Sequence, residues 1–365
     1  MRFYLIGAGV IGKTHAEAIR KLRIEGVELC VADPNPSALA GFAELYPEAR
    51  AFSSAEEMLA APAADDDIVI VGTPPFTHCR LSRLALESGR HVLCEKPLVM
   101  NRAEAEELLA VAKAHDRLLG CCSVRFLGLP KMDEVKKLVQ SGALGDIYKA
   151  TFIYRGQRSR PGVEYQPESK WFLDRSKSGG GIVMDWGPYD FSVLNELLAP
   201  SSVEVAAAWT SKPQTQIDPT DTVYDVEGHV GAMLNYRLKD GKTVWVHYER
   251  ASCTHGEAYH HVEIEGTLGA VRWSPYFESD EVVYTRDRNG EPESAITLAV
   301  NESEFGFMDH PVAFFYRKVK GETSQAVVNE QALFNFLCLQ ALYDCAETGK
   351  PQHIERGTRN VNVRI

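Results

Sequence analysis

Two short segments of this 365-residue chain carry titratable side chains in settings typical of ligand sites. The first, residues 94–97, reads Cys-Glu-Lys-Pro and ends an apolar stretch. The second, residues 178–189, holds three consecutive glycines before Asp185 and Tyr189. Glycines let a backbone pass close to a ligand, and ammonium, carboxyl and phenol groups exchange protons. Lys96, Asp185 and Tyr189 are therefore candidates for acid–base chemistry.

A glycine-rich turn near the start of the chain indicates which ligand these residues serve. Residues 7–12 read Gly-Ala-Gly-Val-Ile-Gly, directly after the apolar residues 3–6 and before a helical pattern at 13–21. A strand, a G-x-G-x-x-G turn and a helix form the phosphate cradle of dinucleotide-binding folds. The first glycine permits the tight turn, the second lets the backbone approach the pyrophosphate, and the third lets helix and strand pack closely. The free N–H groups of the helix N-terminus then face the phosphates.

An acidic residue stands where the same fingerprint places the ribose contact. Residues 27–32 are predicted to form the second strand, and Asp33 ends it, about 20 residues beyond the last glycine. A carboxylate there accepts hydrogen bonds from the ribose hydroxyls and repels a 2′-phosphate, and the following residues 34–36 are Pro-Asn-Pro, with no basic side chain. We therefore expect NAD rather than NADP. The alternative is an aspartate that only shapes a turn before proline.

The elements that position these residues alternate between strand and helix over the first third of the chain. Residues 67–72 and 91–94 are predicted to form buried strands, and a capping box at 101–104 opens a helix. This alternation predicts an α/β Rossmann domain with a doubly wound parallel sheet, whose ligands bind at the carboxyl ends of the strands. Lys96 should therefore point toward the bound nicotinamide.

Beyond residue 123 the pattern changes to long segments with alternating apolar residues. These segments are 146–155, 203–210, 223–238, 243–251 and 261–265. Period-two alternation predicts an open-faced, mostly antiparallel sheet in a C-terminal α+β domain, and a helix is expected from about 329 to 348. We expect an NAD-binding Rossmann domain at 1–123 and a substrate-binding and oligomerisation domain at 124–365.

Composition narrows the class of protein. The net charge is −11 and the basic residues are dispersed, which argues against nucleic acid or an anionic membrane surface as the main partner. We expect neither a membrane span nor a secretory leader, because no apolar run is long enough and Met1 and Arg2 lead directly into the first strand. The eight cysteines lack metal-ligand spacing, and the adjacent His260 and His261 face opposite sides of a strand. We therefore expect reduced thiols in a cytoplasmic protein and no metal site.

The motifs together resemble the Gfo/Idh/MocA family, which groups glucose-fructose oxidoreductase, inositol dehydrogenase and rhizopine catabolism proteins. The resemblance rests on the glycine turn, Thr73 and Pro74 with His78, the Glu-Lys-Pro sequence at 95–97, and the run 179–189. It covers the whole Rossmann half, and the second domain mainly at that one run. It implies an oxidoreductase with an open-faced sheet in its second domain.

Carried over position by position, the resemblance implies a cofactor site on the first domain. The positions that would contact NAD are Gly7, Gly9, Val10, Ile11, Asp33, Thr73, Pro74, His78, Glu95, Lys96 and Arg125. The glycine turn would hold the pyrophosphate and Asp33 the ribose, while residues 73, 74 and 78 would line the cofactor cleft. Glu95 would lie near the nicotinamide ribose and Arg125 beside the nicotinamide. A purely structural ion pair is the alternative for Arg125.

The resemblance also implies a substrate site, with Lys96 on the reacting hydroxyl and with Arg125, Trp171, Asp185 and Tyr189 around it. The spacing of Asp185 and Tyr189 predicts one face of a helix that begins near Asp185. A helix N-cap is the alternative for Asp185, and a core position is the alternative for Trp171. Most family members carry His in place of Tyr189. Tyrosine is typical of the subgroup of glucose-fructose oxidoreductase and the dimeric dihydrodiol dehydrogenases.

A tyrosine suits proton transfer in both directions of a hydride transfer. A phenol titrates at about 10, so as a base at neutral pH it needs the Lys96 ammonium and the positive nicotinamide nearby to lower its pKa. As an acid in carbonyl reduction Tyr189 is already protonated. Lys96 itself or a water relay are the alternative proton carriers.

The residues and the resemblance together predict an NAD-dependent oxidoreductase that acts on a hydroxyl or keto carbon of a sugar, sugar derivative or cyclitol. The alternatives are a redox-neutral glycosidase that retains its NAD, and a non-catalytic, cofactor-sensing regulator on the same fold. Because an open sheet face needs a cover, we expect a homodimer or homotetramer built sheet to sheet.

Overall fold

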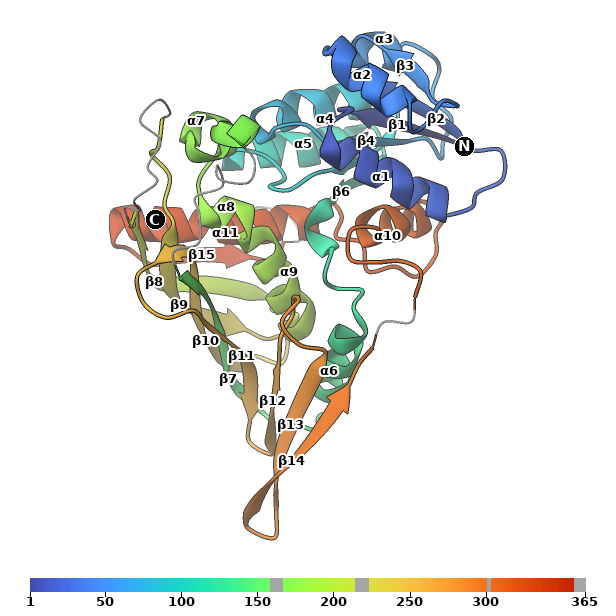
Figure 1. The fold of residues 1–365 in the computed structure, drawn as a ribbon. Helices are drawn as coiled ribbons and strands as arrows, with labels where there is room; N and C mark the ends of the chain where they lie inside the picture. Colours follow the sequence, from blue (N-terminus) through green and yellow to red (C-terminus); the bar gives the residue numbers. More distant parts are fainter. Residues whose placement is uncertain (158–166, 214–222, 301–302, 358–365) are drawn as a thin grey trace. The chain divides into compact units, whose positions relative to one another are not determined.

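The chain divides into two units, each built on its own β-sheet (Figure 1). The computed structural model describes residues 1–157, 167–213, 223–300 and 303–357. The first unit consists of Met1–Arg125 and Ser303–Phe336, and the second of Phe126–Glu302 and Leu337–Ile365. The first unit thus includes a late segment of the chain in addition to the N-terminal stretch.

The first unit holds a parallel sheet, as the alternating strand and helix patterns predict. Its strand order in the described part is β3-β2-β1-β4-β5-β6, and every neighbouring pair is parallel. The strands are β1 (Arg2–Ile6), β2 (Glu28–Ala32), β3 (Arg50–Phe52), β4 (Ile68–Val71), β5 (His91–Cys94) and β6 (Leu119–Cys121). The order reverses between β1 and β4, and sheets of this kind bind ligands at the carboxyl ends of the strands beside that reversal.

Helices cover both faces of this sheet. They are α1 (Val10–Lys21), α2 (Pro36–Ala43), α3 (Ala55–Leu59), α4 (His78–Glu87), α5 (Arg102–Ala114) and α10 (His310–Val319), with the 3₁₀ turns η1 (Pro75–Thr77) and η2 (Cys122–Val124). On one face Phe3 and Leu5 of β1 pack with Ile19 of α1, Phe42 of α2 and Phe315 of α10. Helix α4 packs against β4, β5 and α5. The late segment of the chain therefore supplies one of the helices, α10, that complete the core of the first unit.

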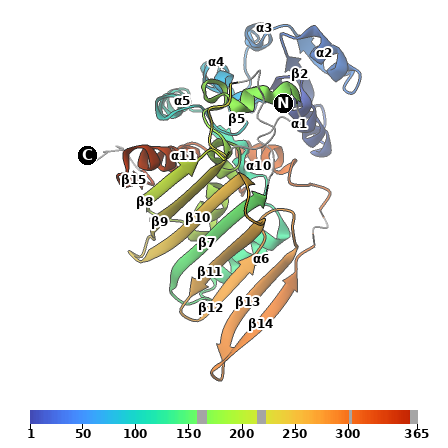
Figure 2. The ribbon, with the colours of Figure 1, turned by 60° about the vertical axis from the view of Figure 1, so that its left-hand side comes forward.

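The second unit holds a large sheet that is antiparallel except for one pair (Figure 2). In the described residues its order is β14-β13-β12-β11-β7-β10-β9-β8-β15, and only β7 and β10 run parallel. The strands are β7 (Ile147–Gln157), β8 (Ser202–Ser211), β9 (His229–Arg237), β10 (Thr243–Thr254), β11 (Tyr259–Gly266), β12 (Gly269–Trp273), β13 (Glu281–Arg288), β14 (Glu291–Leu298) and β15 (Gln352–Glu355). The predicted mostly antiparallel sheet is confirmed, although the strand expected from residue 223 begins only at His229.

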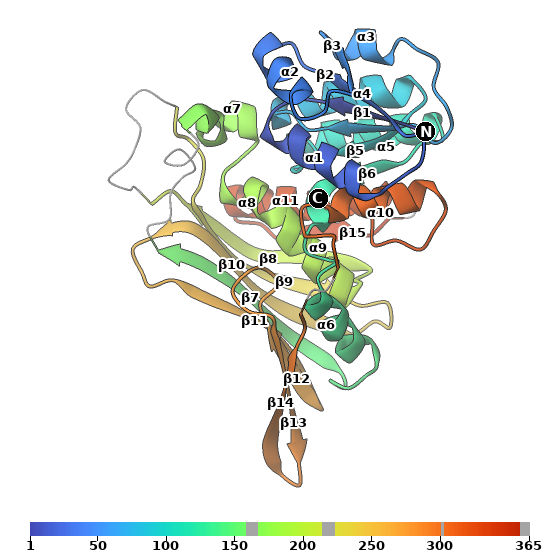
Figure 3. The same cartoon turned by 45° about the vertical axis from the view of Figure 1, so that its right-hand side comes forward.

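Helices cover one face of the second sheet and leave the other open (Figure 3). The helical elements are α6 (Pro130–Gln140), η3 (Pro167–Leu173), α7 (Arg175–Ser178), α8 (Ile182–Asp185), α9 (Gly187–Leu198) and α11 (Glu330–Thr348), the last of which begins in the first unit. Helix α6 packs on β12 and β13, and α8 packs on β9 and β10. On the open face Trp209, Met233 and Trp245 are 48%, 40% and 44% exposed. None of the described helices has the length and apolar character that a membrane crossing requires.

Candidate functional site

The glycine turn joins β1 to α1, and its three glycines lie in different surroundings. Gly7 has a φ of +107°, and a Cβ there would lie 2.7 Å from the carbonyl oxygen of Gly72. A Cβ at Gly12 would lie 2.0 Å from the carbonyl oxygen of Gly7, so the helix packs this closely on the strand only with glycine. At Gly9, by contrast, a Cβ would meet no described atom within 4 Å. Gly9 is the N-cap of α1 and makes no side-chain cap hydrogen bond, and the N–H groups at such a helix start can bind an anion.

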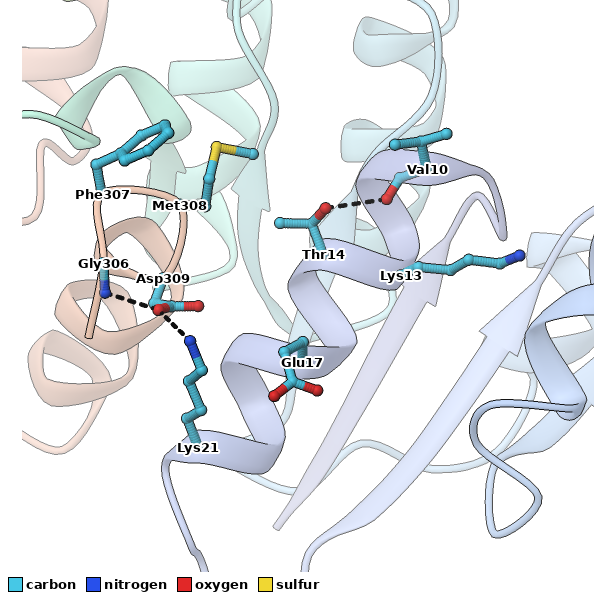
Figure 4. Close-up of a pocket in the computed structure, with 9 residues that line it drawn as sticks. All are labelled: Val10, Lys13, Thr14, Glu17, Lys21, Gly306, Phe307, Met308 and Asp309. Atoms are coloured by element: carbon cyan, nitrogen blue, oxygen red, sulfur yellow. Dashed lines mark hydrogen bonds and ion pairs between the residues drawn. The ribbon is translucent and has the colours of Figure 1, made fainter. Parts of the chain in front are cut away.

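A groove of about 590 Å³ runs along α1 (Figure 4). Its lining residues are Val10, Lys13, Thr14, Glu17 and Lys21 of α1, and Gly306, Phe307, Met308 and Asp309 from the segment before α10. At one end Lys21 Nζ lies 2.7 Å from Asp309 Oδ2. At the other end Val10, the first residue of α1, is 76% exposed. The accessible end of the groove therefore adjoins the glycine turn.

Asp33 follows β2 and bonds back to the glycine turn. Its Oδ2 accepts a hydrogen bond from the backbone N of Ala8 at 2.9 Å, and its Oδ1 accepts one from Asn35 at 2.8 Å. The side chain is half-buried. Two backbone donors thus hold the carboxylate beside the phosphate cradle, where the fingerprint expects the ribose.

The ends of β4 and β5 carry the next predicted residues. Thr73 follows β4, and its hydroxyl shares a 2.6 Å hydrogen bond with that of Thr77, while Pro74 precedes η1. The backbone N of Glu95 donates to the carbonyl of Val71 at 2.9 Å, which extends the pairing of β4 and β5 to their carboxyl ends. Lys96 comes next, and the Lys96–Pro97 peptide bond is cis.

Glu95 is the centre of a buried polar cluster. Its Oε1 accepts a hydrogen bond from Arg125 Nη2 at 2.5 Å and lies 2.9 Å from His15 Nε2, while its Oε2 accepts one from the backbone N of Lys96 at 3.0 Å. Burial alone would raise the pKa of Glu95, but the charge of Arg125 and the bond to His15 bring this pKa well below its ordinary value. Glu95 is therefore a fixed carboxylate that bonds the peptide of Lys96. The ion pair that is the alternative role for Arg125 is present.

Cys122 lies beside this cluster, and its Sγ falls within 4.8 Å of ligand atoms of His15 and Glu95. These three donors do not fit a metal ion. Arg125 already neutralises the carboxylate, and burial raises the pKa of the Cys122 thiol well above its ordinary value, so the metal-binding thiolate is disfavoured. The cluster is an ion-pair network.

In the second unit, the glycines at 179–181 allow the backbone to pack closely against other residues of the same unit. Gly179 ends α7 with a φ of +80°. A Cβ at Gly180 would lie 2.0 Å from the Tyr343 hydroxyl, and a Cβ at Gly181 would lie 1.8 Å from the carbonyl oxygen of Glu227. The close backbone approach that the sequence indicates is therefore made to Tyr343 and Glu227, two residues that no motif singled out.

Glu227 fixes the start of α8 through hydrogen bonds. Its carboxylate is buried and accepts hydrogen bonds from the backbone N of Gly181 at 3.0 Å, the backbone N of Val183 at 3.1 Å and the Tyr343 hydroxyl at 2.7 Å. Its carbonyl oxygen accepts from the backbone N of Ile182 at 3.1 Å. These bonds satisfy N–H groups that the helix itself leaves unpaired. They also fix the helix whose last residue is Asp185.

The single helix that the spacing predicts near Asp185 is two helices in the structure. Helix α8 ends at Asp185 and α9 begins at Gly187, with Trp186 between them at φ −107°. Pro188 has no N–H for the carbonyl one turn earlier, which explains the break. The expectation that Asp185 and Tyr189 lie on one uninterrupted helix is therefore wrong, since they lie on consecutive helices.

Tyr189 is buried among aromatic rings of the second unit. It is 4% exposed, and its ring meets that of Phe126 edge-on at 5.2 Å and that of Trp186 at 5.7 Å. The guanidinium of Arg250 lies 5.0 Å from the Trp186 ring centre and pairs with the buried carboxylate of Asp190, the neighbour of Tyr189. This ion pair anchors α9 to the sheet.

The third predicted residue of the second unit, Trp171, lies in η3. It is half-buried and stacks on Phe172 with ring centres 3.9 Å apart. Each unit thus gathers its own share of the predicted residues. The first unit collects its positions at the carboxyl edge of one sheet, and the second carries Trp171, Asp185 and Tyr189 on segments that flank the three glycines.

Comparisons with known proteins agree with this division. The family model described as "Oxidoreductase family, NAD-binding Rossmann fold" matches residues 1–122, and the "GFO/IDH/MocA C-terminal domain" matches residues 132–272. An inositol 2-dehydrogenase of Rhizobium meliloti (strain 1021) is 29% identical over 273 residues, which are 74% of this chain and 74% of that protein. A 1,5-anhydro-D-fructose reductase of Ensifer adhaerens is 25% identical over 98% of this chain and 99% of that protein.

A solved levoglucosan dehydrogenase, in complex with NADH and levoglucosan, shares the fold. It superimposes with a TM-score of 0.78 at 20% identity, covering 98% of this chain and 100% of that one.

Proposed function

Because the chain belongs to the Gfo/Idh/MocA family of oxidoreductases and its first unit is an NAD-binding Rossmann domain, we propose that it transfers a hydride between NAD and a hydroxyl or keto carbon of a sugar, sugar derivative or cyclitol. The observation that carries this proposal is the placement of Lys96, whose peptide N–H is held by the Glu95 carboxylate at the carboxyl edge of the sheet. The names of the two relatives, an inositol dehydrogenase and an anhydrofructose reductase, support the substrate class.

The residues of the first unit fit a dinucleotide. The open space at Gly9 and the uncapped start of α1 would receive the pyrophosphate, with Gly7, Val10 and Ile11 around it. Asp33 would accept hydrogen bonds from the ribose hydroxyls, which favours NAD over NADP. Thr73 and Pro74 would line the nicotinamide side, with Glu95 and Arg125 nearby. When bound, the nicotinamide supplies or accepts the hydride.

The protein's own residues would handle the proton. Lys96 would hydrogen-bond the reacting oxygen, and Tyr189 would give a proton in reduction or take one in oxidation. Asp185 would accept a hydrogen bond from a substrate hydroxyl, with Arg125 and Trp171 at the edge of the substrate. The phenolate that oxidation needs would require a nearby positive charge, which the Lys96 ammonium would supply in this proposal.

Two variants test this mechanism. Lys96→Ala and Tyr189→Phe should each lower kcat by about a hundredfold or more, while NAD affinity, measured by fluorescence titration, stays nearly unchanged. Tyr284→Phe is the matched control, because Tyr284 bonds the carbonyl of Ala143 in the second unit and has no part in the proposed chemistry. Undiminished turnover in both site variants would end the mechanism. Glycoside cleavage without net NADH would instead indicate an NAD-retaining glycosidase.

We also propose a homodimer or homotetramer built on the open sheet face, and a cytoplasmic location. The open face exposes large apolar side chains that include Trp209 and Trp245. The eight cysteines are all free thiols, which supports a reducing compartment.

A further inference from the structure

His78, the first residue of α4, is fully buried, and each of its ring nitrogens lies within hydrogen-bonding distance of a backbone carbonyl oxygen. Its exposed fraction is 0%. Nδ1 lies 2.8 Å from the carbonyl oxygen of Pro97, and Nε2 lies 2.8 Å from the carbonyl oxygen of Thr73. The resemblance described above implies that His78 lines the cofactor cleft, but in this structure both polar atoms of the ring are occupied by the protein.

The two carbonyls belong to the turns that follow β4 and β5. Thr73 stands in the first turn, and Pro97 directly follows Lys96 in the second. Lys96 thus has a backbone anchor on each side. The Glu95 carboxylate holds the N–H of Lys96 at 3.0 Å, and His78 holds the carbonyl of the next residue. Residues beyond the end of a strand have no ladder hydrogen bonds to place them, so side-chain contacts of this kind decide where they lie.

We propose that His78 is a positioning residue, which sets where Lys96 stands relative to the Thr73 turn. The inference rests on the proposed role of Lys96 in hydride transfer. His78 touches neither cofactor nor substrate in this assignment and acts only through Lys96. A misplacement of about 1 Å at a reacting group can cost a hundredfold in rate, so the loss of such an anchor is measurable.

The two contacts of the ring are not equivalent. Carbonyl oxygens only accept hydrogen bonds, and a neutral imidazole donates through one nitrogen. Burial lowers the pKa of His78, although the carbonyls of Thr73 and Pro97 and the charge of Glu95 act in the opposite direction. In the neutral ring one carbonyl therefore receives the hydrogen bond. The contact with Pro97 is the one that matters for Lys96.

Three substitutions separate the two contacts. Asparagine places an amide nitrogen near the position of Nδ1, and glutamine places one near Nε2. His78→Asn therefore keeps a donor for Pro97, His78→Gln keeps a donor for Thr73, and His78→Leu removes both. We expect His78→Leu to lower kcat at least tenfold with NAD affinity changed less than about threefold, His78→Asn to recover most of kcat, and His78→Gln to recover little.

A matched control lies on β5, the strand that leads to Lys96. His91 begins β5 at its opposite end and also bonds the backbone with both nitrogens, to Asp65 at 2.9 Å and to Leu118 at 3.0 Å. His91→Leu should lower the Tm but leave kcat unchanged at temperatures below unfolding. Equal kcat in the asparagine, glutamine and leucine variants of His78, or a kcat in His78→Leu equal to that of the unmodified protein, overturns the proposal.

Two double variants tie the effect to Lys96. If His78 acts through Lys96, His78→Asn/Lys96→Ala and His78→Leu/Lys96→Ala have the same kcat as Lys96→Ala alone. If the losses of kcat caused by the two substitutions multiply in the double variants, His78 acts by another route and the inference is overturned. If Lys96→Ala keeps full turnover, the proposed role of Lys96 fails, and the present inference fails with it. If Lys96→Ala loses turnover and His78→Leu does not, only the present inference fails.

Discussion

Arg125 Nη2 donates a hydrogen bond to Glu95 Oε1 at 2.5 Å, and the two residues are only 8% and 5% exposed. A carboxylate at this depth persists only with a charged partner, because an unpaired buried charge costs about 3–5 kcal/mol. The pair also decides what Glu95 offers to its neighbour. With one oxygen engaged by Arg125 and His15, the other oxygen faces the peptide N–H of Lys96. The ion pair and the proposed catalytic lysine are thus linked by one side chain.

Glu95 should make the folded protein sensitive to acid. The pKa of Glu95 in the folded protein lies well below its ordinary value, so the ionised group contributes stability that is fully present above the unfolded pKa of about 4.3 and is lost as the pH falls toward the folded pKa. Glu95→Gln removes this dependence. We expect the variant to have a lower Tm at pH 7, but a Tm that falls less steeply than that of the unmodified protein between about pH 5 and pH 3. Scanning calorimetry across this range checks it, and equal slopes would contradict it.

The glycine turn should separate cofactor binding from stability. A Cβ at Gly9 meets no described atom, so Gly9→Ala should leave the Tm without NAD nearly unchanged and weaken NAD binding, because the methyl group takes the space that the pyrophosphate would use. Gly12→Ala is the contrasting variant. Its Cβ would lie 2.0 Å from the carbonyl oxygen of Gly7, so we expect a lower Tm even without NAD. Thermal melts with and without NAD measure both effects. Unchanged NAD affinity in Gly9→Ala would show that the pyrophosphate does not bind at this turn.

Asp33 should decide the choice between NAD and NADP. Asp33→Asn keeps an oxygen for one of the two backbone donors at Ala8 and Asn35 and removes the charge. We expect NAD affinity to fall about tenfold or more, because hydrogen bonds to a charged group contribute about 1.5–3 kcal/mol, and NADP to lose less because the repulsion of its 2′-phosphate is removed. Titrating both cofactors into both proteins gives the four affinities. Tighter binding of NADP than NAD by the unmodified protein would refute the assignment.

Features with a local signature in the sequence could be predicted. The turn at 7–12, Asp33 and the buried strand β4 depend on residues that are close in the chain, and the structure places Asp33 against the glycine turn as the fingerprint requires. The same holds for the capping box, where the Asn101 side chain accepts from the backbone N of Glu104 at 3.0 Å.

Contacts between distant residues could not be predicted in this way. His15 and Glu95 are 80 residues apart, and Glu227 and Tyr343 are 116 apart. The sequence around Glu227, which precedes β9, does not show whether its carboxylate faces solvent or caps a helix. The hydrogen-bond donors that it caps come from a distant segment. The break at Trp186 is an intermediate case. Pro188 is visible in the sequence, but the spacing of Asp185 and Tyr189 favours one continuous helix.

If the open sheet face forms the proposed interface between copies of the chain, a single charged residue on that face should prevent oligomerisation. Trp245 is 44% exposed and stands between Lys149 and Asn235 on the neighbouring strands. Because the position is half-exposed and lies beside Lys149, which pairs with Glu265 on its other side, Trp245→Glu should fold with little change in Tm. We expect the unmodified protein to be a dimer or tetramer by light scattering at micromolar concentration and the variant to be a monomer. A monomeric unmodified protein would contradict the proposed assembly.

Substitutions at the Glu227–Tyr343 contact should weaken sugar binding and turnover without affecting NAD binding. Glu227→Gln replaces one accepting oxygen by an amide group, and Tyr343→Phe removes the hydroxyl that bonds the carboxylate at 2.7 Å. Because Glu227 fixes the start of α8 and Asp185 ends that helix, both variants should raise KM for the sugar and lower kcat, while NAD affinity stays the same.

Gly181→Ala should act more strongly than either of these variants. Its Cβ would lie 1.8 Å from the carbonyl oxygen of Glu227, so the helix start has to move. The control is Gly256→Ala, where a Cβ would come no closer than 3.7 Å to Thr254 Oγ1. Steady-state kinetics and NAD titration on the four variants distinguish a positioned helix from a general loss of stability. A parallel fall of sugar and NAD affinity would show that Glu227 serves overall folding rather than the placement of Asp185.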